Sequence, residues 1–100
     1  MAENPEFEAR LLECVDRGLG TLGDSTKRAI FWYLEREQGM LYGDIPDEPA
    51  RFMKGLTAIF GAGAKSLESM MLREMEAEFD MRVDSVSFPE AVSRARRKSD

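Results

Sequence analysis

The sequence predicts an all-α fold, a compact bundle of four main helices followed by a short C-terminal helix or arm. Three observations lead to this prediction. Apolar residues recur at three- and four-residue intervals through most of the chain, which is the spacing of one helix face. Prolines and glycines separate these stretches where helices would begin and end. The chain has 100 residues, of which 43% are hydrophobic, and this suits a single modest core.

We expect a helical domain over residues 1–82 and a C-terminal arm with a basic tail over residues 83–100. The first helix is predicted to begin at Asn4-Pro5, because Asn caps a helix start and Pro suits its first position. Glycines weaken its far end, so the helix is expected to stop near Gly18–Gly20. We interpret Cys14, on its apolar face, as a small buried hydrophobe rather than a nucleophile, because the sequence has no His to activate a thiol.

The stretch Asp24–Gly39 is predicted to be the central helix, against which the others bury their apolar faces. Asp24 or Ser25 is expected to cap its start. Gly39 suits its end, where the backbone often needs a positive φ. At about 100° per residue, one face of this helix carries Ile30, Tyr33 and Leu34.

Trp32 falls on the charged side of this helix, with Arg28 one turn before it and Arg36 one turn after it. One interpretation is a half-buried indole with cations over its rim, worth about 0.5–1 kcal/mol at an exposed site. The other is a binding anchor, because Trp is enriched at interface hot spots. Trp32, Arg28 and Arg36 are therefore candidate partner-binding residues.

A loop with two prolines follows, and a third helix is expected to start at Asp47 or Glu48, just before Pro49. Gly55 at the edge of its apolar face would let another backbone approach closely. The next segment, GAGAKS, is not a phosphate-binding P-loop, because that motif needs GxxxxGK[ST] after a strand. Gly61 as a helix C-cap before a tight turn is the simpler interpretation. A weak anion site at the start of the next helix stays open as an alternative.

The fourth helix, predicted over residues 63–79, has an unusually wide apolar surface. Glu68 interrupts one broad face, and Met70, Ala77 and Met81 form a second stripe. Either the helix is sandwiched within the domain, or the second stripe meets another chain. The second interpretation predicts a homodimer with Met70, Ala77 and Met81 at its seam, since Met is common at permissive binding surfaces.

Residues 82–88 are expected to form a short strand or an extended arm, and Ser87 and Pro89 to open a last short helix. Cations cluster near the end of that helix. The cluster is either a solvated, frayed tail or a contact for nucleic-acid phosphates or an acidic partner. Its members are Arg94, Arg96, Arg97 and Lys98.

The composition disfavours several functional classes. The net charge of −5 makes the surface repel a phosphate backbone on average. The sequence has no His, the commonest general base and transition-metal ligand, and it shows no cofactor motif or strong metal spacing. Its single Cys excludes an internal disulfide and favours a cytoplasmic location. No apolar run approaches the roughly 18 residues that a membrane span needs.

Three strings of the sequence resemble a family of small archaeal proteins named for the fifth Nitrosopumilus output domain. They are LGDSTKRAIFWYLE, DIPDEPARF and IFGAGAKSLE, and the resemblance covers about Leu11 to Phe79. Some members of that family follow signalling receiver modules. The resemblance implies a small helical domain with a signalling or regulatory role, and it supplies no catalytic residues.

The predicted function is a non-enzymatic protein-interaction or signalling output module that self-associates and uses no cofactor or metal. The alternative is a nucleic-acid-binding regulator with a helix-turn-helix-like arrangement across the GAGA turn. Against that alternative, the fourth helix carries only Lys65 and Arg73 as cations beside four glutamates. An enzyme is not expected, because a tuned acid, base or nucleophile is not evident.

Overall fold

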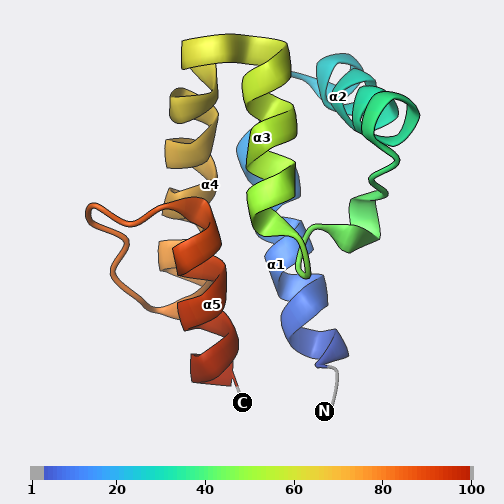
Figure 1. The fold of residues 1–100 in the computed structure, drawn as a ribbon. Coiled ribbons are helices and arrows are strands. Elements are labelled where there is room, and N and C mark those ends of the chain that lie inside the picture. Colours follow the sequence, from blue (N-terminus) through green and yellow to red (C-terminus); the bar gives the residue numbers. More distant parts are fainter. Residues whose placement is uncertain (1–3, 100) are drawn as a thin grey trace.

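Five α-helices joined by short turns account for most of residues 4–99, the part of the chain that the computed structural model describes (Figure 1). No strand occurs within these residues, and their overall dimensions are 32 × 28 × 21 Å. The prediction of an all-α bundle is therefore confirmed. The helices are α1 (Pro5–Gly20), α2 (Asp24–Gln38), α3 (Pro49–Phe60), α4 (Ala64–Phe79) and α5 (Phe88–Ser99), with 3-10 turns η1 (Tyr42–Asp44) and η2 (Gly61–Gly63).

The centre of the bundle is α4, which packs against α1, α3 and α5. In Figure 1, α3 and α4 run antiparallel and are joined at one end by η2, while α2 lies to one side. A helix with three packed neighbours needs an apolar surface wider than one stripe. The interpretation that α4 is packed between other helices of the domain therefore accounts for most of the width of its apolar face. The buried residues of α4 are Ala64, Leu67, Met71, Leu72, Met75 and Phe79.

The helix predicted to be central, residues 24–39, is instead peripheral. Among its residues only Ile30 and Leu34 are buried. Its three consecutive aromatic residues lie about 100° apart around the axis, so they cannot share one core-facing stripe. Leu34 packs so closely on Gly55 of α3 that a methyl group on Gly55 would overlap it. The close approach predicted at Gly55 is thus present, and it fixes α2 to the rest of the fold.

Most of the predicted helix ends are present. Asn4 Oδ1 accepts a hydrogen bond of 3.1 Å from the backbone N–H of Phe7. Gly39 and Gly61 end their helices with φ of 63° and 58°. The start of α2 differs from the prediction: Gly23, with φ of 96°, takes the capping position. Asp24 is then the first helical residue, where its carboxylate still suits the positive end of the helix dipole.

The segment predicted as a C-terminal arm contributes instead to the same core as the rest of the chain. Phe88 packs against Phe52 of α3, with ring centroids 5.8 Å apart. Residues 82–88 form no strand, and Ser85 turns the chain with φ of 57°. The buried stripe of α5, spaced as one helix face, is Phe88, Ala91, Val92 and Ala95.

Candidate interaction surfaces

The most exposed large hydrophobic side chain in the described part of the chain is Trp32, at 61% of its full accessibility. It lies two residues from both Ile30 and Leu34, which places it about 200° around the helix from each of them. The two buried residues hold α2 on the core, so Trp32 points away from the protein. The indole is therefore more exposed than the half-buried interpretation predicts, and the side chain is available to a partner.

Two cations flank this indole. The Arg36 guanidinium lies 5.2 Å from the Trp32 ring centroid. Arg28 lies one turn before Trp32 and is exposed. Neither arginine makes an ion pair with another described residue. We call Arg28, Trp32 and Arg36 the α2 outer face; it combines a flat apolar ring with two unpaired positive charges.

Contacts near the start and at the middle of α2 help to fix its orientation. Lys27 Nζ, in the first turn, lies 2.8 Å from Asp16 Oδ1 of α1. At the middle of the helix, the ring of Phe31 packs edge-on against Tyr42, with centroids 4.9 Å apart. The Tyr42 hydroxyl donates a 2.9 Å hydrogen bond to the carbonyl oxygen of Leu12. Burial, assisted by nearby carboxylates, raises the pKa of Tyr42 to about 12.

The predicted seam on α4 is less exposed than expected. Met70 and Met81 are partly buried and pack against the protein's own core. Met70 Sδ also accepts a 3.2 Å hydrogen bond from the hydroxyl of Thr21. Ala77 is exposed. Of the three seam residues, only Ala77 presents an open surface to another chain.

The predicted basic cluster is divided by the fold. Arg96 donates a 2.8 Å hydrogen bond to the carbonyl oxygen of Pro46, and its guanidinium lies 4.8 Å from the ring centroid of Phe7. Arg94 pairs with Glu90, one turn earlier on α5, at 2.8 Å. Arg97 and Lys98 are exposed. Two of the four cations thus act within the protein, which weakens the prediction of a phosphate-binding tail.

Cys14 is fully buried between α1 and its neighbours, as predicted. Burial raises the pKa of its thiol to about 12, with a further contribution from Glu78. A thiol with this pKa stays protonated at neutral pH and is a poor nucleophile. No group of three or more potential metal-ligating side chains occurs among residues 4–99.

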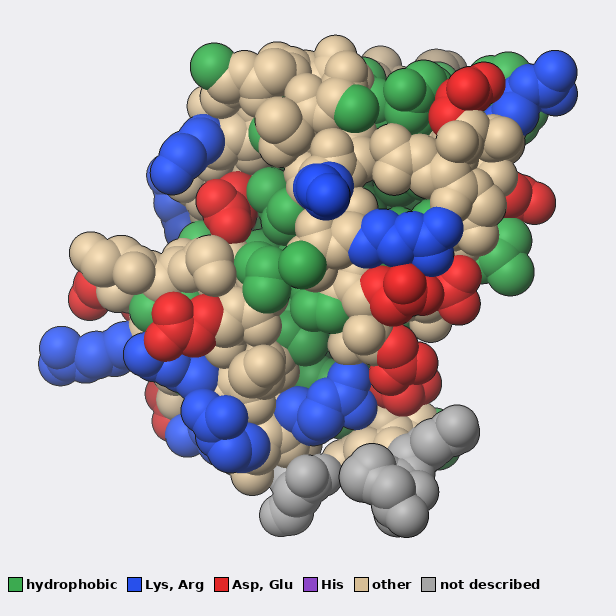
Figure 2. Space-filling model, viewed as in Figure 1, with side chains coloured by type: hydrophobic (Ala, Val, Ile, Leu, Met, Phe, Trp, Pro, Cys, Tyr) green, Lys and Arg blue, Asp and Glu red, His purple; other side chains and the backbone are tan. Residues whose placement is uncertain are grey.

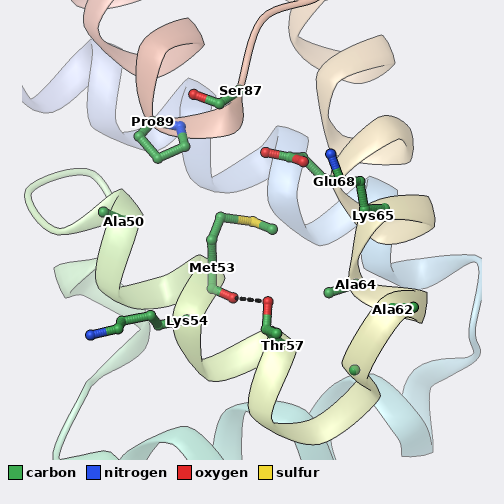
Figure 3. Close-up of a pocket in the computed structure, with 11 residues that line it drawn as sticks. Ala50, Met53, Lys54, Thr57, Ala62, Ala64, Lys65, Glu68, Ser87 and Pro89 are labelled. Carbon is green, nitrogen blue, oxygen red and sulfur yellow. Dashed lines mark hydrogen bonds between the residues drawn. The ribbon is translucent and has the colours of Figure 1, made fainter.

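A groove that was not predicted from the sequence lies where α3, η2, α4 and the start of α5 meet (Figure 3). Its volume is about 600 Å³. Hydrophobic side chains gather in the middle of the face shown in Figure 2, with both basic and acidic side chains around them. Only one wall of the groove has a pattern in the sequence, which does not show what faces that wall: four lining residues of α3 fall at positions i, i+3, i+4 and i+7. They are Ala50, Met53, Lys54 and Thr57.

Within residues 4–99, none of the helices has the length and apolar character that crossing a membrane requires. Comparison of the chain with models of known protein families, with curated proteins and with solved structures gives no match.

Proposed function

We propose that this protein is a non-enzymatic protein-interaction module that binds a partner protein through the α2 outer face, formed by Arg28, Trp32 and Arg36. One observation carries the proposal: Trp32 is 61% exposed on a helix whose buried residues hold it facing away from the core. A signalling output role, which the family resemblance implies, fits this mode of action by contact.

The chemistry of the α2 outer face supports this proposal. Trp is enriched among interface residues whose truncation costs about 2 kcal/mol or more. The stacked guanidinium of Arg36 is already ordered before binding, which lowers the entropy that a partner must offset. Arginine binds carboxylates with two parallel hydrogen bonds. The surface therefore suits a partner that offers an apolar pocket flanked by Asp or Glu side chains.

The test compares capture of partner proteins by immobilised wild-type protein, Trp32→Ala and a control on the same helix, Thr26→Ala. Trp32 and Thr26 are both exposed, so neither change is expected to unfold the protein. For a captured partner we expect Trp32→Ala to weaken binding by about 30-fold or more, and Thr26→Ala to leave it unchanged. Equal binding by all three proteins would exclude the α2 outer face.

Self-association through the α4 stripe is a separate part of the proposal, and its support is weaker because Met70 and Met81 pack against the protein's own core. Ala77 is the better site for a test, because it is exposed and replacing it leaves the core intact. Light scattering at two protein concentrations should show a dimer for the wild type and a monomer for Ala77→Lys. A monomeric wild type, or a dimer that survives Ala77→Lys, would remove this seam.

A further inference from the structure

The furrow between α3 and α4 is only partly filled by the protein itself. Part of it is covered by α5, whose Phe88 is buried and packs against Phe52. The helix begins at Phe88, and the furrow continues past this start as the open groove. In Figure 3, Ser87 and Pro89 lie at the α5 end of the groove, and Ala62 lies at the η2 end.

The two long walls of the groove are helix faces. The α3 wall runs from Ala50 to Thr57, about 10 Å along the helix axis at 1.5 Å per residue. The α4 wall consists of Ala64, Lys65 and Glu68. In Figure 3, the Met53 side chain extends into the space between these walls. Met53 is only partly buried, and a flexible thioether side chain adapts to the shape of an apolar partner.

The charges of the groove are not balanced within the protein. Lys54 and Lys65 line opposite walls, and no ion pair joins either of them to another described residue. The lining has one acid, Glu68, whose carboxylate keeps its negative charge while it accepts a 2.8 Å hydrogen bond from the backbone N–H of Phe88. The lining therefore has two positive charges against one negative charge, a small positive excess beside an apolar floor in a protein whose net charge is −5.

We propose that this groove binds a short acidic amphipathic helix of a partner protein. A helix is the favoured occupant because the walls are two antiparallel helices, and α5 already occupies the adjoining length of the same furrow. Apolar residues on one side of the partner helix would pack on Met53, and carboxylates on its flanks would reach Lys54 and Lys65. This is helix-in-groove recognition, and it is independent of the α2 outer face.

The probe for the test is a synthetic helical peptide of Ala and Glu with a stripe of Leu, acetylated and amidated at its ends. A matched peptide carries Lys in place of every Glu. Backbone amide shifts of the labelled protein are followed by NMR at low ionic strength. We expect the acidic peptide to shift the amides of Ala50, Met53 and Ala64 in a saturable manner, and the basic peptide to leave them in place.

Variants locate the contact. The double change Lys54→Glu with Lys65→Glu should weaken acidic-peptide binding by about tenfold or more, which is about 1.4 kcal/mol. The double change Arg73→Glu with Arg82→Glu makes a charge change of the same size at two exposed cations outside the groove, so it should have little effect. Trp32→Ala should bind the peptide as the wild type does, which separates this proposal from the α2 outer face.

Several outcomes would overturn the proposal. They are the absence of shifts in the groove, equal binding of the acidic and basic peptides, and a loss in the double change Arg73→Glu with Arg82→Glu as large as in the lysine variant. A short DNA duplex that shifted the same amides more strongly than the acidic peptide would also overturn it, because the ligand would then be a phosphate backbone rather than an acidic helix.

Discussion

At the scale of single residues, two glycines at the end of α1 have different roles. A Cβ atom on Gly18 would lie 2.9 Å from Met71 Cγ and 3.1 Å from Met71 Cα, whereas one on Gly20 would have no atom within 4 Å. The sequence alone predicts that both glycines weaken the helix. The structure shows that Gly18 instead allows α1 and α4 to pack in close contact.

Gly18→Ala is expected to lower the free energy of unfolding by about 1–3 kcal/mol, because the added methyl group overpacks the contact with Met71. Gly20→Ala is the matched control. It should be neutral or raise stability by up to about 1 kcal/mol, since Ala is the better helix former. Urea unfolding of the two variants measures both changes. Equal destabilisation by both would contradict the close contact.

Glu78 links α4 to α1 and gives a prediction on pH. Arg10 Nε donates a 2.8 Å hydrogen bond to Glu78 Oε2, and Arg17 lies 3.7 Å from the other carboxylate oxygen. The hydrogen bond from Arg10, assisted by the positive charges of both arginines, lowers the pKa of Glu78 from its usual 4.5. The folded state therefore binds this proton less readily than the unfolded state. The ion pair stabilises the fold above about pH 4.5 and is lost as the pH falls through the lowered pKa.

Replacing Glu78 with Gln should thus lower stability at neutral pH and flatten the loss of stability on acidification below about pH 5. Glu76→Gln changes an exposed acid of the same helix that makes no ion pair with a described residue. It should leave the pH profile unchanged. Thermal unfolding across this pH range provides the measurement, and parallel profiles for Glu78→Gln and the wild type would refute the linkage.

At the scale of elements, α5 shows how charge can conceal a packing stripe. Its arginines and lysine suggest a solvated tail, but the same helix also carries apolar residues at helical spacing. They are Phe88, Ala91, Val92 and Ala95.

Phe88→Ala should lower the free energy of unfolding by about 3–5 kcal/mol, as expected for a fully buried Phe. The exposed Ser93→Ala should change stability by less than about 0.5 kcal/mol. If denaturant unfolding gave small effects for both, α5 would not belong to the core.

The narrow attachment of α2 predicts that it opens more easily than α4. Among its described residues only Ile30 and Leu34 are buried, whereas six residues of α4 are. Local opening requires less free energy where fewer apolar contacts are lost. Amide hydrogen exchange should therefore be faster over Phe31–Leu34 than over Met71–Met75. Equal protection of the two helices would mean that α2 opens only with the whole fold.

At the scale of the whole molecule, the sequence predicts the fold class well because helix caps and apolar periodicity are local signals. Asn4, Gly39 and Gly61 illustrate this, since each acts within one turn of its own helix. Which helix is central is not a local property. It depends on how many neighbouring helices each apolar face packs against. The cluster of aromatic residues in α2 does not indicate that number.

The same distinction between local and non-local features applies to the candidate sites. Trp32 could be predicted because helix geometry alone places it opposite Ile30 and Leu34. The groove could not, because it arises where α5 begins relative to the α3–α4 furrow. The charge distribution is visible in the sequence and agrees with the location of the groove: residues 1–49 carry 11 acidic and 5 basic side chains, and residues 50–100 carry 8 acidic and 9 basic.

The contact between Arg96 and Phe7 has a consequence for how this protein can be attached to another. It holds the last turns of α5 beside the first turns of α1, so that the start of α1 and the end of α5 lie at the same pole of the molecule (Figure 1). A polypeptide fused before α1 or after α5 would leave from this pole. The η2 end of the groove lies toward the opposite pole. A polypeptide attached at either terminus would therefore leave this end of the groove accessible to a partner.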